Sequence, residues 1–368
     1  MPQALVVNRS DFSSSQIIEL RLPPLAPGYV RLKVESFAVT ANNVTYAVNG
    51  NQFRYWDFFP ASNDWGIVPM WGHAIVEETR CTEIAVGERV YGFLPAATHL
   101  DVLPGRISSR AFIDTVAHRQ PMSSIYNQYS RLAADPEHDP AYEDQRMIYG
   151  PLFKTAFLVE RFFSRNDWFG AQTAVISSAS SKTALATAYC LKTSSPNIRR
   201  IGLTSAGNVE FVISSGLFDK VLAYSAVDSL NRIPAVSIDF AGNESLMLRI
   251  HSHLGSALRF SSTVGITHAG VGPAHRYVGV FPGPEPVVFF APTEAMVMLG
   301  EVGHRVFADG VASSWDGFLE AAGQVVTIDR EFGLDGARET FAATLAGQVK
   351  PSTAKIICMQ DPRVLKIA

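Results

Sequence analysis

The feature that most constrains the fold is a strand, a turn of small residues and a helix that follow one another directly. Residues 173–177 form an apolar run of strand type, and residues 183–192 are rich in alanine and other helix-forming residues. A turn in this position aims free backbone N–H groups and the positive end of a helix at a single point. Dinucleotide pyrophosphates are held in this way, so we expect a βα unit that binds an anionic dinucleotide.

Two other interpretations of this turn stay open. The usual dinucleotide turn carries glycines, because backbone and helix approach closely, but serine and alanine stand here instead. Ser181, Lys182 and Thr183 resemble the end of a nucleoside-triphosphate P-loop, although the glycines that this loop needs before its lysine are missing. An ordinary turn capped by serine is the third possibility. We favour a dinucleotide site that uses Ser178, Ser180, Ser181, Lys182 and Thr183.

The second strand of this unit bears on which dinucleotide is bound. Sites that prefer NAD usually carry Asp or Glu at the end of this strand to bind the ribose hydroxyls. Here the strand ends in Thr204 and Ser205, Asn208 follows, and no acid is present. Hydroxyl and amide groups can donate to a 2′-phosphate and Lys182 can neutralise it, so NADP(H) is expected. Helix capping by Thr204 and Ser205 is the alternative.

The chain divides into a β-rich first part and a second part in which strands and helices alternate. The first part, up to about residue 100, has short strand candidates at residues 4–7, 29–37, 72–78 and 89–93. From about residue 151, the alternation predicts βαβ units and a buried parallel sheet. Its further strand candidates are residues 200–205, 220–224, 235–242 and 262–266. Residues 119–148 are polar and aromatic, which indicates an insertion or an interdomain helix-and-loop element.

Length and composition exclude several classes of protein. A chain of 368 residues, 47% of them hydrophobic, can bury two domain cores. Its net charge of −3 gives no reason to expect nucleic acid or an anionic membrane as a partner. The first ten residues do not have the pattern of a signal peptide, and no stretch is apolar enough for a membrane span. Three widely spaced cysteines fit a reducing cytoplasm better than a disulfide framework.

With these features, and over nearly its whole length, the chain resembles the medium-chain dehydrogenase/reductase superfamily. Residues 27–34 resemble its early strand, and residues 68–73 and 87–92 resemble its Gly-His-Glu and Gly-Asp-Arg-Val elements. Residues 241–243 lie where its members carry a Gly-Gly turn. More narrowly, the chain is similar to a branch known only as a domain of unknown function. The segments that carry this second likeness are residues 40–46, 149–155, 177–183 and 202–205.

The resemblance implies an α/β fold with a GroES-like β-rich catalytic domain and a Rossmann domain that contains a doubly wound parallel sheet. The catalytic domain would comprise residues 1–150 and 296–368, with residues 119–148 as the insertion, and the Rossmann domain residues 151–295. Thr155 matches a family threonine near the nicotinamide, and a helix-surface residue is the alternative. Further cofactor contacts are expected from Tyr224, Ala241, Gly242 and Gly265.

The resemblance also implies that no metal takes part. Zinc-dependent relatives carry a cysteine where this chain has Ala41. The family's ligand histidine is matched by His73, but Ala74 replaces its glutamate neighbour, and the four-cysteine structural lobe is missing. A lone histidine makes a poor zinc site, because tetrahedral zinc needs three or four protein ligands.

Without a metal, a phenol or an imidazole must stabilise the oxyanion or enolate that forms when hydride is added. The resemblance places Asn42, Tyr46 and His73 in the interdomain cleft. Tyr46 is the first candidate for the proton donor, and an aromatic wall residue is the alternative. His73 is either catalytic or a structural histidine. Tyr126 and Tyr129 are further candidates, because an aromatic segment can roof a pocket.

The function expected from this set is reduction of an activated C=C or C=O of a small apolar substrate by NADPH. Dimers are usual in the superfamily, so the resemblance makes a homodimer one possible assembly. Enones, quinones, enoyl compounds, aldehydes and ketones are the substrate classes that the resemblance suggests. A non-catalytic sensor of NADP(H) is a second hypothesis, supported by the turn without glycine. A lyase, isomerase or hydratase on the same scaffold is the third.

Overall fold

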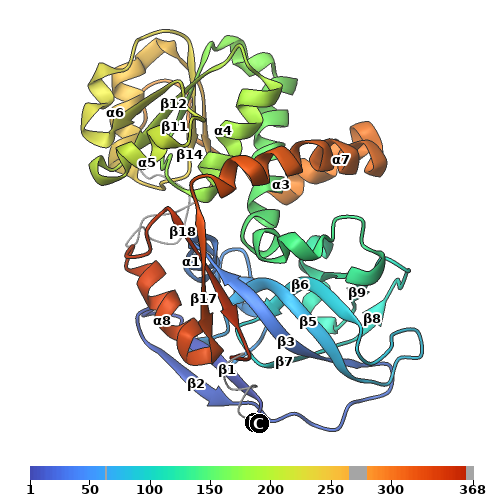
Figure 1. Cartoon of the computed structure of the whole chain (residues 1–368). Coiled ribbons are helices and arrows are strands. Elements are labelled where there is room, and N and C mark those ends of the chain that lie inside the picture. The colour runs from blue at the N-terminus through green and yellow to red at the C-terminus, as the bar shows by residue number, and fades with distance from the viewer. Residues whose placement is uncertain (63, 265–279, 362–368) are drawn as a thin grey trace. The chain divides into compact units, whose positions relative to one another are not determined.

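The computed structural model describes residues 1–62, 64–264 and 280–361, and the chain divides into two compact units (Figure 1). Unit 1 consists of Met1–Ile148, Ile328–Val349 and Ala354–Ala368. Unit 2 consists of Tyr149–Thr327 and Lys350–Thr353. Each unit has β-sheet structure and a hydrophobic core of its own.

Unit 2 is built on a six-stranded sheet in the order β13-β12-β11-β14-β15-β16, and every neighbouring pair is parallel (Figure 1). The strand order reverses between β11 and β14, and ligands of such sheets bind outside the carboxyl ends of the strands at this point. The predicted doubly wound parallel sheet is confirmed. Its strands are β11 (Thr173–Ile176), β12 (Arg199–Thr204), β13 (Lys220–Ala223), β14 (Ala235–Asp239), β15 (Leu258–Thr263) and β16 (Val287–Val288).

Apolar residues cover both faces of this sheet, because successive residues of a strand point to opposite faces. Ala174 and Ile176 of β11 pack with residues of α3 (Glu143–Arg165) and α4 (Lys182–Ser194). Val175 packs on the other face with residues of α6 (Glu244–Leu254). The short helix α5 (Val209–Ser214) connects β12 to β13. Burial on both faces explains why these strands are continuous apolar runs in the sequence.

The domain boundary expected at residue 296 lies inside the long helix α7 (Ala291–Gly323). Its Phe318 stacks on Phe153 of α3 with 4.9 Å between ring centroids, and it meets Tyr189 of α4 at 5.6 Å. This packing holds α7 within unit 2. The chain therefore returns to unit 1 at Ile328 and not at residue 296 as expected from the sequence.

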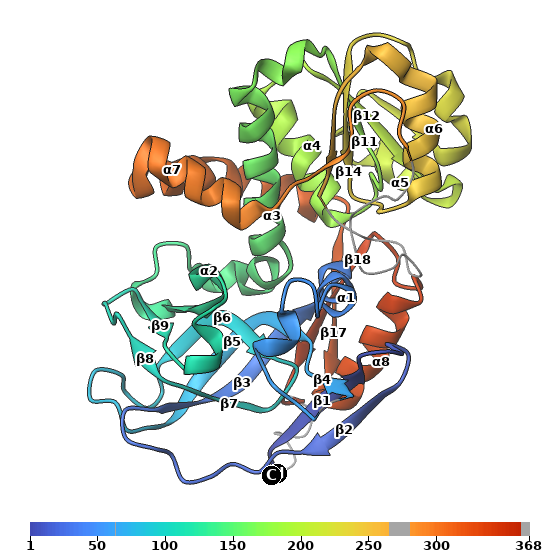
Figure 2. The same ribbon diagram turned by 180° about the vertical axis from the view of Figure 1, so that it is seen from behind.

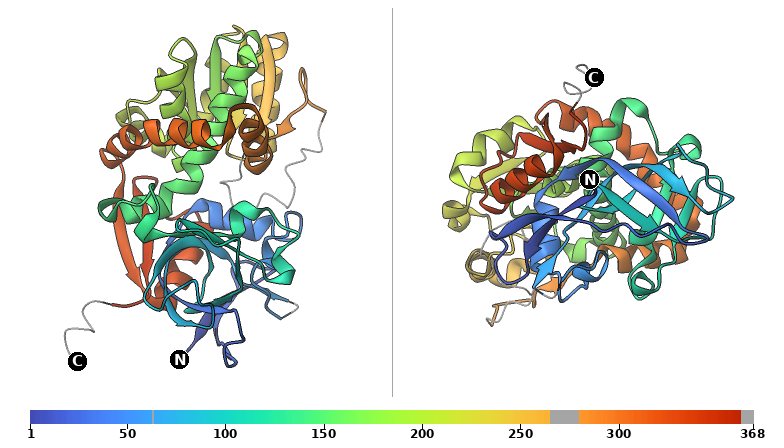
Figure 3. Two further views of the ribbon diagram at one scale, coloured as in Figure 1. Left: turned by 90° about the vertical axis from the view of Figure 1, so that its right-hand side faces the viewer. Right: turned by 90° about the horizontal axis from the view of Figure 1, so that it is seen from below.

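Unit 1 contains a nine-stranded sheet and a three-stranded sheet, whose strands curve around a common interior (Figure 3). The larger sheet has the order β17-β18-β3-β5-β6-β10-β9-β8, with β7 paired to β3, and the smaller has the order β2-β1-β4. The helix α8 (Gly333–Leu345) contacts β1 and β2 (Figure 2). The strands are β1 (Gln3–Asn8), β2 (Ser15–Glu19), β3 (Val30–Val39), β4 (Trp65–Gly66), β5 (Pro69–Thr79), β6 (Arg89–Pro95), β7 (His99–Val102), β8 (Pro104–Gly105), β9 (Ala111–Asp114), β10 (Gln128–Arg131), β17 (Thr327–Phe332) and β18 (Thr353–Cys358).

One strand of unit 1 lies in the segment that was expected to be an insertion. Residues 128–131 form β10, which pairs with β6 on one side and with β9 on the other. Tyr129 is fully buried and stacks on Phe112 of β9 at 5.3 Å. Part of the segment 119–148 is therefore integral to the sheet, and the rest contains α2 (Ser124–Asn127) and the start of α3.

Candidate functional site

The turn between β11 and α4 contains no glycine, yet one of its residues has a positive φ. Ser178 adopts a left-handed conformation with φ of 48°, which glycine favours and serine rarely adopts. Ser181 caps α4, because its Oγ accepts a hydrogen bond from the N–H of Ala184 at 3.3 Å. The close approach that glycine usually permits within the turn is provided by Gly202 on β12, where a Cβ would lie 2.9 Å from the Cβ of Ala179.

Three polar side chains from the predicted set meet at the carboxyl ends of β11 and β12. The hydroxyl of Thr204 and the amide of Asn208 each donate a hydrogen bond to Ser180 Oγ at 3.2 Å. A hydroxyl oxygen that accepts two hydrogen bonds keeps its own proton for another acceptor. Ser205 is exposed and does not cap the short helix that it precedes, so the capping alternative is wrong for this residue.

Lys182 and Tyr224 flank this turn. The Lys182 ammonium donates to the carbonyl of Thr353 at 2.8 Å, and burial lowers the pKa of Lys182 to about 8. Burial raises the pKa of Tyr224 to about 12, against the effect of its hydrogen bond with Ser178. The tyrosine therefore lies beside the strained residue of the turn, at the carboxyl end of β13.

Three other residues were expected to bind the cofactor, and their positions are as follows. The hydroxyl of Thr155 donates to the Pro151 carbonyl at 3.0 Å within α3. Thr183 lies half-buried in the first turn of α4. Gly265 lies outside the described residues.

A buried pair that the sequence analysis missed links β11 to β14. Ser177 donates from its hydroxyl to Asp239, which is fully buried at the end of β14. The Asp239 carboxylate also accepts from the N–H groups of Ala241 at 3.0 Å and Gly242 at 3.1 Å. Gly242 has φ of 67°, so the turn after β14 is fixed by one carboxylate and one glycine. An acid directly before Phe-Ala-Gly at a strand end was the available sequence pattern.

Unit 1 holds a cluster of aromatic rings that contains two of the predicted catalytic residues. Tyr46 comes from α1 (Ala41–Val48) and Tyr126 from α2. The rings contact one another with centroid distances from 4.5 to 6.3 Å. The members of this aromatic cluster are Tyr46, Tyr55, Phe58, Trp71, Phe93 and Tyr126.

The Tyr46 hydroxyl accepts two hydrogen bonds from groups that can only donate. Asn42 Nδ2 lies 2.7 Å from the Tyr46 oxygen, and Trp71 Nε1 lies 3.1 Å from it. Asn42 and Tyr46 are four residues apart on α1 and therefore share a helix face. Both acceptor positions of the phenol are filled, so its proton is left to donate to a further group.

The phenols of the cluster stay protonated at neutral pH. Burial raises the pKa of Tyr46 well above its usual value, and the proximity of Tyr126 adds to the rise. Hydrogen bonds from Trp71 and Asn42 act in the opposite direction but do not outweigh burial. Tyr46 is thus a neutral hydrogen-bond donor, which suits an oxygen atom that gains negative charge.

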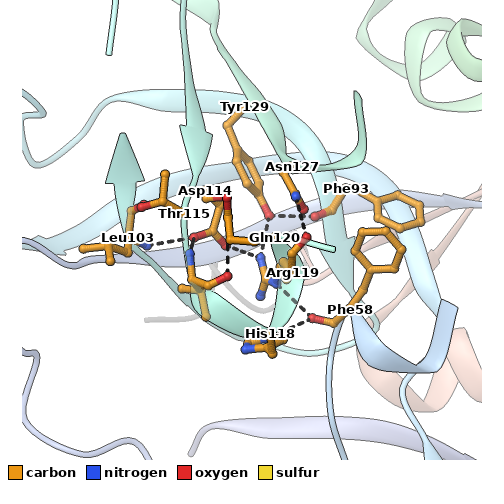
Figure 4. A network of polar contacts seen from close by, with 11 residues as sticks. Phe58, Phe93, Leu103, Asp114, Thr115, His118, Arg119, Gln120, Asn127 and Tyr129 are labelled. Atoms are coloured by element: carbon orange, nitrogen blue, oxygen red, sulfur yellow. Dashed lines mark hydrogen bonds and ion pairs between the residues drawn. The ribbon is translucent and has the colours of Figure 1, made fainter. Parts of the chain in front are cut away.

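A buried ion pair joins Asp114, the last residue of β9, to Arg119 in the segment that leads to α2 (Figure 4). Arg119 is 3% exposed and Asp114 is not exposed at all, and the Arg119 guanidinium donates to the Asp114 carboxylate. Arg119 Nε also donates to the carbonyl of Phe58 at 2.9 Å. The candidate Tyr129 lies in this network and donates to the Phe93 carbonyl at 2.8 Å, so its hydroxyl is used within the protein.

A family model described as "Protein of unknown function (DUF2855)" matches residues 37–350. The chain belongs to this family. A search of curated proteins gives no match.

Several solved structures are similar to this chain in fold at low sequence identity. CurA from Vibrio vulnificus has a TM-score of 0.63 and 14% identity over 99% of this chain and 100% of that chain. The yhdH oxidoreductase from Salmonella enterica, solved with NADP, has a TM-score of 0.56 and 13% identity over 97% and 100%. A putative NADPH:quinone reductase from Bacillus thuringiensis has a TM-score of 0.57 and 14% identity over 98% and 99%. The expected fold of the medium-chain reductases is thereby confirmed.

His73 is buried, and its ring has no hydrogen-bond partner in the described part of the chain. Its exposed fraction is 0%, and neither ring nitrogen has a partner among the described residues. Burial lowers the pKa of His73 to about 3, so the imidazole is neutral and cannot act as a general acid near neutral pH. Tyr91 lies 5.2 Å from it between ring centroids. The ring therefore carries a buried N–H whose desolvation is not offset by a hydrogen bond.

We predict that His73→Leu raises the free energy of unfolding by about 1–2 kcal/mol, because it removes this uncompensated polar group. Thermal melting of the purified variant measures the change. The matched control is His251→Leu, since His251 is equally buried but bonds Ser261 Oγ at 2.9 Å and the Pro282 carbonyl at 3.0 Å. The control should be destabilised. Equal destabilisation of both variants would contradict the prediction and show that His73 has a stabilising partner.

In the ranges 1–62, 64–264 and 280–361, no three His, Cys, Asp or Glu side chains gather as they would around a metal ion. No helix in the same ranges combines the length and the apolar character that crossing a membrane requires.

Proposed function

We propose that this chain is an NADPH-dependent reductase that transfers hydride to an activated C=C or C=O of a small, uncharged and largely apolar substrate. The observation that carries the proposal is the Tyr46 hydroxyl, whose two acceptor positions are filled by Asn42 and Trp71. A buried phenol that has only its proton left to share is suited to bind a carbonyl oxygen. The surrounding rings provide apolar walls for the rest of such a substrate.

The residues of unit 2 fit the diphosphate and 2′-phosphate of NADP(H). The turn between β11 and α4 offers backbone N–H groups, and Ser180 has a proton to donate. Lys182 supplies the positive charge, and no acid stands at the end of β12 to repel a phosphate. The yhdH oxidoreductase and a second CurA structure, both of similar fold, were solved with NADP and NADPH respectively, which supports this choice of cofactor.

The roles of the chain's own residues follow from these groups. NADPH, when bound, supplies the hydride. Tyr46 donates its hydrogen bond to the substrate oxygen and stabilises the negative charge that grows there. Trp71 and Asn42 fix the direction of that donor, because both hold the same phenol oxygen. The aromatic walls exclude water, which strengthens the hydrogen bond.

We further propose that the reaction uses no zinc and takes place in a reducing compartment. The absence of ligand side chains at Ala41 and Ala74 supports the first point. Cys81, Cys190 and Cys358 are all free thiols, which supports the second.

The test of the cofactor site is a titration with NADPH and NADH followed by nicotinamide fluorescence. We expect micromolar affinity for NADPH and much weaker binding of NADH. Lys182→Met should weaken NADPH binding about 10-fold, which corresponds to about 1.4 kcal/mol, and should leave NADH binding unchanged. Because the pKa of Lys182 is lowered to about 8, its charge is lost as the pH rises through 8, and NADPH affinity should fall there in the wild type alone.

The matched control is Lys192→Met on the same helix. Lys192 also donates to a backbone carbonyl, that of Gly216 at 3.0 Å, but it lies in the last turn of α4. It should not alter either affinity. Failure of the wild type to bind both dinucleotides would overturn the assignment, and binding without loss of NADPH in the presence of cyclohex-2-en-1-one or other enones, quinones and aldehydes would argue against a reductase.

A further inference from the structure

The aromatic cluster contains a second hydroxyl donor that the proposed role of Tyr46 does not use. The hydroxyl oxygens of Tyr55 and Tyr126 lie 3.2 Å apart, so one of the two donates to the other. Two phenols bring two protons, and their mutual hydrogen bond uses only one of them. In the part of the chain that the structure describes, neither hydroxyl has another recorded partner. The pair therefore always has one O–H left for a ligand or a water molecule.

This hydroxyl pair is close to Tyr46. The rings of Tyr46 and Tyr55 are 4.5 Å apart between centroids. The Tyr55 ring in turn lies 5.9 Å from the Tyr126 ring between centroids. A ligand held at Tyr46 is thus within reach of a second donor in the same cluster.

Arg119 forms hydrogen bonds with both of the segments that carry the hydroxyls of Tyr55 and Tyr126. Tyr55 is the first residue of the short helix Tyr55–Asp57. Phe58 directly follows this helix, and its carbonyl accepts a hydrogen bond from Arg119 Nε at 2.9 Å. On the other side, Asn127 follows Tyr126 directly and donates from Nδ2 to the Arg119 carbonyl at 2.9 Å. One buried residue therefore ties together the two segments that carry the hydroxyls (Figure 4). Chance contact between two flexible side chains would not have this support.

We propose that the Tyr55–Tyr126 hydroxyl pair binds a second oxygen of the substrate, so that this site selects uncharged carbonyl compounds with two acceptor oxygens. Arg119 is the positioning residue of the pair. The proposal rests on the proposed function in so far as Tyr46 holds the first oxygen. Every side chain of the cluster is uncharged, which favours a neutral ligand over a carboxylate or a phosphate.

The experiment compares binding of cyclohexane-1,4-dione and cyclohexanone to the NADP⁺-saturated protein, measured by saturation-transfer NMR titration. The oxidised cofactor prevents reduction of either ketone, so the result does not depend on turnover. One extra hydrogen bond predicts that the wild type binds the dione about 3- to 10-fold more tightly. The double variant Tyr55→Phe/Tyr126→Phe should bind both ketones equally.

The single variants Tyr55→Phe and Tyr126→Phe test the proposal further. Each of Tyr55→Phe and Tyr126→Phe retains one hydroxyl whose proton is no longer shared, so at least one of them should keep the preference for the dione. The control Tyr142→Phe removes an exposed hydroxyl from unit 1 and should match the wild type. Equal binding of the two ketones by the wild type, or a preference that survives in the double variant, overturns the proposal. A preference for the dione in a protein that never oxidises NADPH overturns only the reductase function.

Discussion

Replacing Tyr46 with phenylalanine is expected to lower kcat/KM for an enone about 100- to 1000-fold, the usual loss when one oxyanion donor is removed. The loss has two sources. The substrate oxygen loses its donor, and the N–H groups of Asn42 and Trp71 lose their acceptor in a buried place. The measurement is the initial rate of NADPH loss with cyclohex-2-en-1-one over a range of enone concentrations.

Two controls separate this effect from damage to the fold. The Kd for NADPH should stay within about 2-fold of the wild type, because the proposed phosphate-binding side chains Ser180 and Lys182 form their hydrogen bonds within unit 2 and Tyr46 forms its own within unit 1. Trp71→Phe should cost less than Tyr46→Phe, since it removes only one of the two groups that orient the phenol. A Tyr46→Phe enzyme with more than a third of the wild-type kcat/KM would refute the assigned role.

The Rossmann part of the fold could be predicted because its strands are buried on both faces. The strand expected at residues 173–177 is β11, Thr173–Ile176, and the strand expected at residues 235–242 is β14, Ala235–Asp239; every residue of both is buried. By contrast, β10 was missed because it places one apolar side chain, Tyr129, in the core and leaves polar residues around it. So short a strand shows no alternation in the sequence. The expected return to the first domain at residue 296 differs from the unit boundary at Ile328, because helical periodicity does not say which core a helix joins.

The candidate site was predictable where its contacts follow from local geometry. Asn42 and Tyr46 share a helix face, and Ser180, Thr204 and Asn208 meet because neighbouring parallel strands end at one edge. Contacts between residues far apart in sequence could not be deduced in this way. Trp71 reaches Tyr46 from a strand, and Tyr55 reaches Tyr126 across 71 positions of the chain. Such pairs depend on how the sheet of unit 1 folds around its core.

The second large effect is expected at Arg119, where replacement by methionine should lower the free energy of unfolding by about 3–5 kcal/mol. Asp114 would then be a buried carboxylate without its cation. Its other oxygen would still accept from the N–H groups of Leu103 at 3.0 Å and Val116 at 3.1 Å, which does not neutralise the charge. Urea unfolding, followed by the fluorescence of Trp56 and Trp71 in unit 1, measures the loss.

Two further variants test whether loss of the Arg119–Asp114 ion pair itself causes the destabilisation. Arg338→Met breaks an ion pair with Asp335 whose side chains are 42% and 75% exposed, and it should cost less than about 1 kcal/mol. In Asp114→Asn/Arg119→Met no unpaired charge remains, so the double variant should be more stable than Arg119→Met alone. If Arg119→Met loses no more free energy of unfolding than Arg338→Met, the Arg119–Asp114 ion pair does not stabilise unit 1. If instead the expected loss is found, Arg119 stabilises unit 1, and its hydrogen bonds with the Phe58 carbonyl and Asn127 support the proposed positioning of Tyr55 and Tyr126.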